Sequence, residues 1–177
     1  MNSFLGALRL LAIVVWVGGL AFFAFILAPV AFHVLPSTHE AGLVVAGTLR
    51  IFSQVAPVCG AVFVVATMVL WFRIGSVPHR SLAMEVVLVV LMLVGTTYVQ
   101  LDIIPAMEHA RAAAGGVIEA VDKTNPARVD FERLHGLSEK AEGGVLLLGL
   151  GVVLLMAAEP DGSEGSEILE SLETIDS

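Results

Sequence analysis

Cysteine and charged residues are both scarce in this chain of 177 residues. The single cysteine, Cys59, excludes a disulfide within one chain and any metal or redox motif built from paired cysteines. Asp, Glu, Lys and Arg make up only 15% of the residues, whereas about 25% is usual for a soluble domain. Because 57% of the residues are hydrophobic, the composition favours a membrane protein over a soluble protein with a large core.

Positive charge is lacking at the C-terminal end, where residues 161–177 hold six acidic residues and no Lys or Arg. The rest of this segment is rich in Ser and Gly, a composition typical of disorder. Its charge would repel anionic lipid and nucleic acid, so nucleic acid is not expected as a partner. We predict a transmembrane domain over residues 1–160 and an acidic, disordered tail over 161–177.

Charge is also lacking over long stretches, and the first of them sets the architecture. No charged side chain occurs from Leu10 to Phe32, and these 23 residues exceed the roughly 20 that a helix needs to cross a bilayer core. The run is too long for the apolar region of a signal peptide, so we expect a retained first span, roughly 4–35. Three further apolar helices are expected at about 41–73, 80–113 and 126–158. The sequence therefore predicts an all-α, integral membrane four-helix bundle, multi-pass in the cell membrane.

Small residues, proline and arginine in the first helix predict how it packs. Gly18 and Gly19 would allow another helix to approach closely. Pro29 is expected to bend the last two turns. Arg9 lies near the start of the helix, where its guanidinium is expected to reach the lipid headgroups.

Polar residues gather at one end of the predicted bundle. Four spans place the loops around 36–40 and 115–126 on one side, where four of the five histidines lie. Helical spacing brings a polar group from each helix to the same half of the bundle. The candidate polar site consists of His33, Arg50, Gln54, Asp102, His109, His135, Ser138, Glu139 and Glu142. Because ionisable groups near hydrocarbon usually face the interior and pair, we expect Arg50 to pair with Asp102 or Glu142.

Two interpretations of this polar end remain open. The polar groups form either a structural cap that fixes the register of the helices, or a site for a metal, a tetrapyrrole or a transported solute. Imidazole and carboxylate groups suit Zn, Cu or Fe. The sequence nevertheless holds no HxxxH or HExxH motif, and no nucleophile–base or cofactor motif. The metal and the cofactor, if any, are not named by the sequence.

A resemblance to a known family starts from residues 131–138. Their sequence, FERLHGLS, closely resembles the F-x-R-x-H-G-L-S signature of the eukaryotic transmembrane protein 205 family. The first helix and its loop are similar to the same family at Trp16, Pro29, Phe32, Leu35, Pro36, Gly42, Leu43 and Val44. The chain looks like a prokaryotic member of this family, whose domain is one of unknown function. The resemblance implies four spans and no settled activity.

A more distant similarity is to the copper resistance protein D group and to the membrane-bound protoporphyrinogen oxidase of bacteria. These are also compact helical membrane proteins with functional histidines. The present sequence does not match their histidine pattern residue by residue, so none of their ligands is carried over.

Together these observations favour a non-enzymatic membrane protein whose polar end binds or passes a small solute or a metal ion. Two alternatives stay open: a membrane oxidoreductase that uses haem or a porphyrin, and a purely structural membrane assembly protein. The lipid bilayer is the expected partner, and a homo-oligomer remains open.

Overall fold

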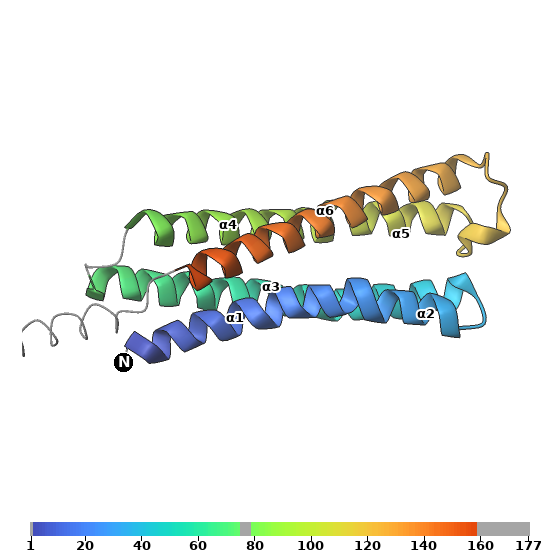
Figure 1. Cartoon of the computed structure of the whole chain (residues 1–177). Coiled ribbons are helices and arrows are strands. Elements are labelled where there is room, and N and C mark those ends of the chain that lie inside the picture. The colour runs from blue at the N-terminus through green and yellow to red at the C-terminus, as the bar shows by residue number, and fades with distance from the viewer. Residues whose placement is uncertain (1, 75–78, 159–177) are drawn as a thin grey trace, which may run out of the picture.

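Four long helical segments make up the protein, and the computed structural model describes residues 2–74 and 79–158 (Figure 1). Two of the four segments contain a short π-helical stretch. The elements, in order, are α1 (Asn2–Phe22), η1 (Phe23–Leu27, π), α2 (Ala28–Val34), α3 (Thr38–Ile74), α4 (His79–Tyr98), η2 (Val99–Ile103, π), α5 (Ile104–Ala113), η3 (Ile118–Ala120, a 3₁₀ turn) and α6 (Pro126–Ala157). The acidic tail predicted over 161–177 lies outside the described residues and stays a prediction.

The predicted all-α four-helix bundle is confirmed. Four helical segments are long and apolar enough to cross a membrane, and their mean hydropathy falls from 2.7 in the first to 1.8 in the last. Large apolar side chains cover the outer surface, among them Phe4, Phe25, Phe72 and Leu147, each more than two-thirds exposed. Apolar surface of this extent is unfavourable in water, at roughly 25 cal/mol per Å². It is suited to lipid.

Both ends of the described chain lie at the same end of the bundle (Figure 1). We call this the terminal end, where α1 begins and α6 ends. The opposite end, which we call the loop end, carries the connections 35–37 and 114–125. An even number of spans requires this arrangement, as the sequence predicted.

The core is built from side chains of all four helical segments. Ile13 and Trp16 of α1, Phe63 of α3, Met92 of α4 and Val152 of α6 are each no more than 1% exposed. They form one contiguous cluster in the middle of the bundle. The cluster holds the two helical hairpins, α1–α3 and α4–α6, against each other.

A buried ion pair lies at the terminal end of this core. Arg9 of α1 pairs with Glu85 of α4, and their side chains are 3% and 0% exposed. The guanidinium also lies 5.3 Å from the centroid of the Phe63 ring. The expectation that Arg9 reaches the headgroups is therefore wrong. A carboxylate on the facing helix offers a charge partner inside the bundle, and ionisable residues in membrane spans generally take such partners.

Each π-helical stretch ends two residues before a proline. η1 precedes Pro29, and η2 precedes Pro105. A proline ring clashes with the carbonyl of the residue four positions earlier and removes a backbone donor. Widening the preceding turn relieves both effects, which is a common origin of π turns in helices. The structure has a wider turn just before Pro29, and the bend predicted at Pro29 stays a prediction.

A candidate binding cleft at the loop end

A cleft of about 520 Å³ opens between the two hairpins at the loop end. Here α2 packs on α3 and α5 packs on α6, and the cleft lies between these two pairs. The wall from η1, α2 and α3 is largely apolar, with Phe23, Phe25 and Phe32 among its residues. The wall from α5, η3 and α6 carries most of the charged groups. Ligand sites in proteins typically have volumes of about 300–1,000 Å³, a range that includes this cleft.

The loop before α6 sets the position of the charged wall. α5 ends at Ala113 and is followed by Gly115 and Gly116, whose φ angles of +79° and +94° favour glycine. Asn125 caps the start of α6, and its side-chain oxygen accepts a hydrogen bond of 2.9 Å from the amide of Ala127. Pro126 then occupies the first helical position, where a missing N–H is harmless. This confirms the start of the fourth helix that the sequence predicts.

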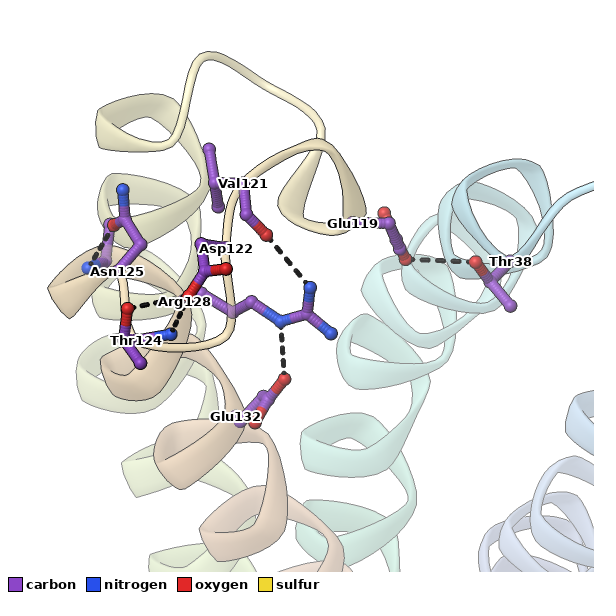
Figure 2. A network of polar contacts seen from close by, with 9 residues as sticks. Thr38, Glu119, Val121, Asp122, Thr124, Asn125, Arg128 and Glu132 are labelled. Atoms are coloured by element: carbon purple, nitrogen blue, oxygen red, sulfur yellow. Dashed lines mark hydrogen bonds and ion pairs between the residues drawn. The ribbon is translucent and has the colours of Figure 1, made fainter.

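Two side chains tie this loop to its neighbours (Figure 2). Arg128 of α6 contacts Glu132 at 2.9 Å and donates a hydrogen bond of 3.0 Å to the carbonyl of Val121. Thr38, at the start of α3, donates a hydrogen bond of 3.1 Å to Glu119. The second contact crosses from one hairpin to the other and limits the outer end of the cleft.

Within the loop, Thr124 fixes the carboxylate of Asp122. The hydroxyl of Thr124 donates a 2.6 Å hydrogen bond to Asp122, and its amide donates one of 2.8 Å. These two hydrogen bonds, the hydroxyl first, lower the pKa of Asp122 below its usual value. Asp122 is therefore a charged turn residue that shapes the loop.

A column of four side chains runs along the charged wall. The guanidinium of Arg111 lies 5.2 Å from the centroid of the Phe131 ring. Phe131 stacks on His135, with ring centroids 6.1 Å apart and an interplanar angle of 12°. His135 Nε2 lies 3.3 Å from Glu139 Oε1. All four side chains line the cleft, so this column presents a cation, two rings and a carboxylate to whatever enters it.

Glu142 lies at the inner end of the cleft. Its side chain lines the cleft and also a smaller inner cavity of about 20 Å³. This inner cavity sits between the four helical segments, and several of its side chains are polar: Trp16, Ser53, Thr96 and Gln100. A volume of this size can hold a water molecule. Glu142 thus stands between an open site and a small polar interior.

The structure brings together only part of the predicted polar site. His135, Ser138, Glu139 and Glu142 line the cleft. The buried Ser138 hydroxyl donates to the carbonyl of His135 at 2.9 Å. The remaining five predicted residues have exposed side chains and do not line the cleft: His33, Arg50, Gln54, Asp102 and His109.

The predicted partner of Arg50 is wrong. Arg50 pairs with Glu108 of α5 at 2.7 Å, not with Asp102 or Glu142, and both side chains are more than half exposed. The physical reason is η2. A π turn holds an extra residue, so the regular step of about 100° per residue that was used to predict the faces is lost there. The same effect of η1 accounts for His33, which follows the first π turn.

Several cleft residues were not predicted: Thr38, His39, Arg111, Glu119, Arg128 and Glu132. The helical stripe of α6 contained a signal for one of them. Extending the face of Phe131 and His135 back by one turn reaches Arg128 at the start of the helix. Among residues 2–74 and 79–158, no three His, Cys, Asp or Glu side chains come close enough together to hold a metal ion.

Comparison with protein families identifies the family of this chain. A family model described as a domain of unknown function (DUF4149) matches residues 11–115, more than half of the chain. The chain belongs to this family. The DUF4149 match covers most of α1 and extends just beyond α5, so η3 and α6 lie outside it.

Comparison with curated proteins and with solved structures gave no match. The DUF4149 match supports the expected domain of unknown function. It gives no support to the resemblances to transmembrane protein 205 or to copper resistance protein D. The segment 131–138, which carries the first resemblance, lies outside the DUF4149 match.

Proposed function

We propose that this protein, located in the cell membrane, binds a small amphipathic molecule in the cleft at the loop end. The observation that supports the proposal is the composition of its two walls. Aromatic and aliphatic side chains line one wall, and charged side chains line the other. Binding sites for small molecules commonly combine an apolar surface with a few polar groups that set orientation.

The two walls of the cleft would contact different parts of the ligand. Transfer of an apolar group to the wall of Phe23, Phe25 and Phe32 removes apolar surface from water, at roughly 25 cal/mol per Å². The column from Arg111 to Glu139 supplies donors and acceptors for a polar group. The proposed activity is binding or passage of a solute, in which no covalent bond is made or broken.

Filling the cleft tests this proposal. Gly42 lines the cleft, and a Cβ at this position would meet no atom within 4 Å. We therefore expect Gly42→Phe to fold normally and to reduce ligand binding by at least about tenfold, since the ring occupies the apolar wall. The measurement is photolabelling by a neutral, diazirine-bearing monoacylglycerol in lipid nanodiscs, with the labelled peptides located by mass spectrometry.

Gly47→Phe is the matched control. Gly47 lies on the same helix, also has open space at its Cβ position, and does not line the cleft. Both changes replace a helical glycine, so their effects on helix propensity are alike. The proposal would be contradicted if Gly42→Phe left the labelling of α6 peptides unchanged.

A change at His135 tests the charged wall. His135→Ala removes the ring that stacks on Phe131 and faces Glu139. We expect binding to weaken by about tenfold, the equivalent of one hydrogen bond of about 1.4 kcal/mol. His33→Ala, at an exposed position outside the cleft, should leave binding unchanged. Equal effects of the two changes would argue that His135 has only a structural role.

One observation favours a second candidate function. His39 of α3 and His135 of α6 both line the cleft, and imidazole nitrogen can bind haem iron. An oxidoreductase that holds haem or a porphyrin between them would show a Soret band in the purified protein. A Soret band that is lost in both His39→Ala and His135→Ala would favour this second function over the first.

A further inference from the structure

We infer, on the basis of the proposed function, that the ligand of the cleft is an organic cation with an apolar body. Its charged centre would lie beside the carboxylate of Glu142, and its apolar groups would lie against the phenylalanine wall. A lipophilic amine, a quaternary ammonium or a phosphonium ion has this chemistry. The inference rests on which charges of the cleft already have partners within the protein.

The other carboxylates of the cleft have partners within the protein. Arg128 contacts Glu132 and the carbonyl of Val121. Arg111 lies over the Phe131 ring. Glu119 accepts a hydrogen bond from Thr38, and Glu139 lies 3.3 Å from His135.

Glu142 differs from them. Within the part of the chain that the structure describes, its carboxylate takes part in no hydrogen bond and no ion pair. The side chain is largely removed from solvent, and Glu139, one turn earlier, adds a second negative charge. A carboxylate in such a place is unfavourable unless a cation compensates it. The cleft is the open side from which a cation can arrive.

A second, independent observation comes from the other side of Glu142. Trp16 lines the inner cavity together with Glu142, and its indole is 1% exposed. Its Nε1 has no hydrogen-bond acceptor among the described residues. A water in the inner cavity would accept from Trp16 and donate to Glu142, and hydrogen bonds to a carboxylate stabilise its charged form. The inner cavity thus offers Glu142 a single water-sized site, and the cleft is the side with room for a cation.

The aromatic residues of the cleft fit the same ligand class. Phe23, Phe25 and Phe32 of one wall face a site that also contains Phe131. Aromatic faces attract cations through the quadrupole of the ring, and this attraction is strongest where water is excluded. A cation with aromatic or alkyl substituents therefore gains from both the carboxylate and the rings.

Two ions of nearly the same shape and opposite charge test the inference. Tetraphenylphosphonium and tetraphenylborate have similar size and differ in sign. We expect the detergent-purified protein to bind tetraphenylphosphonium at least about tenfold more tightly than tetraphenylborate in equilibrium dialysis. Glu142→Gln, which keeps the shape and removes the charge, should weaken tetraphenylphosphonium binding by at least about tenfold and leave tetraphenylborate binding unchanged.

The control is Asp130→Asn, which removes an exposed carboxylate that pairs with Arg133 outside the cleft. It should change neither affinity. If Glu142→Gln fails to fold, the test uses the wild type and Glu142→Asp. Both keep the carboxylate, so both should bind tetraphenylphosphonium more tightly than tetraphenylborate.

The outcomes separate this inference from the proposed function. Equal binding of the two ions, or tighter binding of the borate, would overturn the inference. Labelling by the neutral amphiphile that Gly42→Phe abolishes would still support the cleft as a site. If neither ion binds and Gly42→Phe has no effect on labelling, the proposed function fails as well.

Discussion

Replacing Glu85 with alanine should lower the free energy of unfolding by about 3–5 kcal/mol, among the largest losses expected from a single change in this protein. Removal of this side chain leaves the Arg9 guanidinium inside the bundle without its carboxylate, at a position that is 3% exposed. Loss of a partner carboxylate costs far more free energy for a buried charge than for one at the surface. Equilibrium unfolding in mixed micelles, followed by circular dichroism during a titration with SDS, measures the loss.

The double variant Arg9→Leu/Glu85→Leu separates charge from packing. Without either charge, the site holds two apolar side chains, and replacement of a buried ion pair in this way is often neutral or stabilising. We expect the double variant to recover most of the stability that Glu85→Ala loses. Arg133→Ala is the control, since Arg133 pairs with Asp130 at 3.7 Å on the exposed surface and should contribute about 1 kcal/mol or less. A double variant as unstable as Glu85→Ala would contradict the interpretation.

The second large effect is expected at Gly149, in the half of α6 nearer the terminal end. A Cβ at this position would overlap Val17 of α1 and would lie 3.1 Å from Met92 of α4. Val17 is a stiff, buried side chain, so the helices themselves must move apart. We expect Gly149→Leu to destabilise the bundle by about 3 kcal/mol, at the upper end of typical overpacking effects. The same SDS titration measures it.

Gly144→Leu is the matched change on the same helix. A Cβ at Gly144 would meet no atom within 4 Å, so leucine there should leave stability nearly unchanged or raise it slightly through helix propensity. Similar losses for the two variants would mean that the approach of α6 to α1 is not set by Gly149. An alanine at position 149 provides an intermediate step, with a smaller expected loss.

The sequence predicted the helices well because their signal is local. Long runs without charge, the pair Asn125–Pro126 and the glycines after residue 113 fix where the helices begin and end. Each of these signals depends on residues a few positions apart. The all-α class and the common side of both termini follow from the same runs.

The ion pair and the faces of the helices were harder to predict. Arg9 and Glu85 are 76 residues apart, and nothing local indicates that they meet. A charged side chain near a helix end can lie either among the lipid headgroups or inside the bundle, and the sequence alone does not choose between these positions. The π turns before Pro29 and Pro105 then shift the phase of every residue that follows in their segments. Neither α3 nor α6 has a π turn, but only the predicted face of α6 lines the cleft, whereas Arg50 and Gln54 of α3 do not.

Glycine pairs illustrate the same limit. Gly18 and Gly19 were expected to allow the close approach of a helix, and only one of them does so. A Cβ at Gly19 would overlap the ring of Phe52 on α3, whereas one at Gly18 would meet open space. The motif predicts the contact, and the three-dimensional arrangement decides which residue makes it.

The unequal fastening of the two hairpins has a mechanical consequence. At the terminal end, the buried ion pair between Arg9 and Glu85 joins the hairpins. At the loop end, the contacts between the hairpins include a hydrogen bond from Thr38 to Glu119 and an ion pair between Arg50 and Glu108, and all four side chains are exposed. An exposed ion pair contributes about 1 kcal/mol or less, so breaking these contacts at the loop end costs little free energy. The hairpins are thus joined more strongly at the terminal end than at the loop end. Separation of the hairpins at the loop end would therefore require less free energy than separation at the terminal end, and it would leave the core cluster packed.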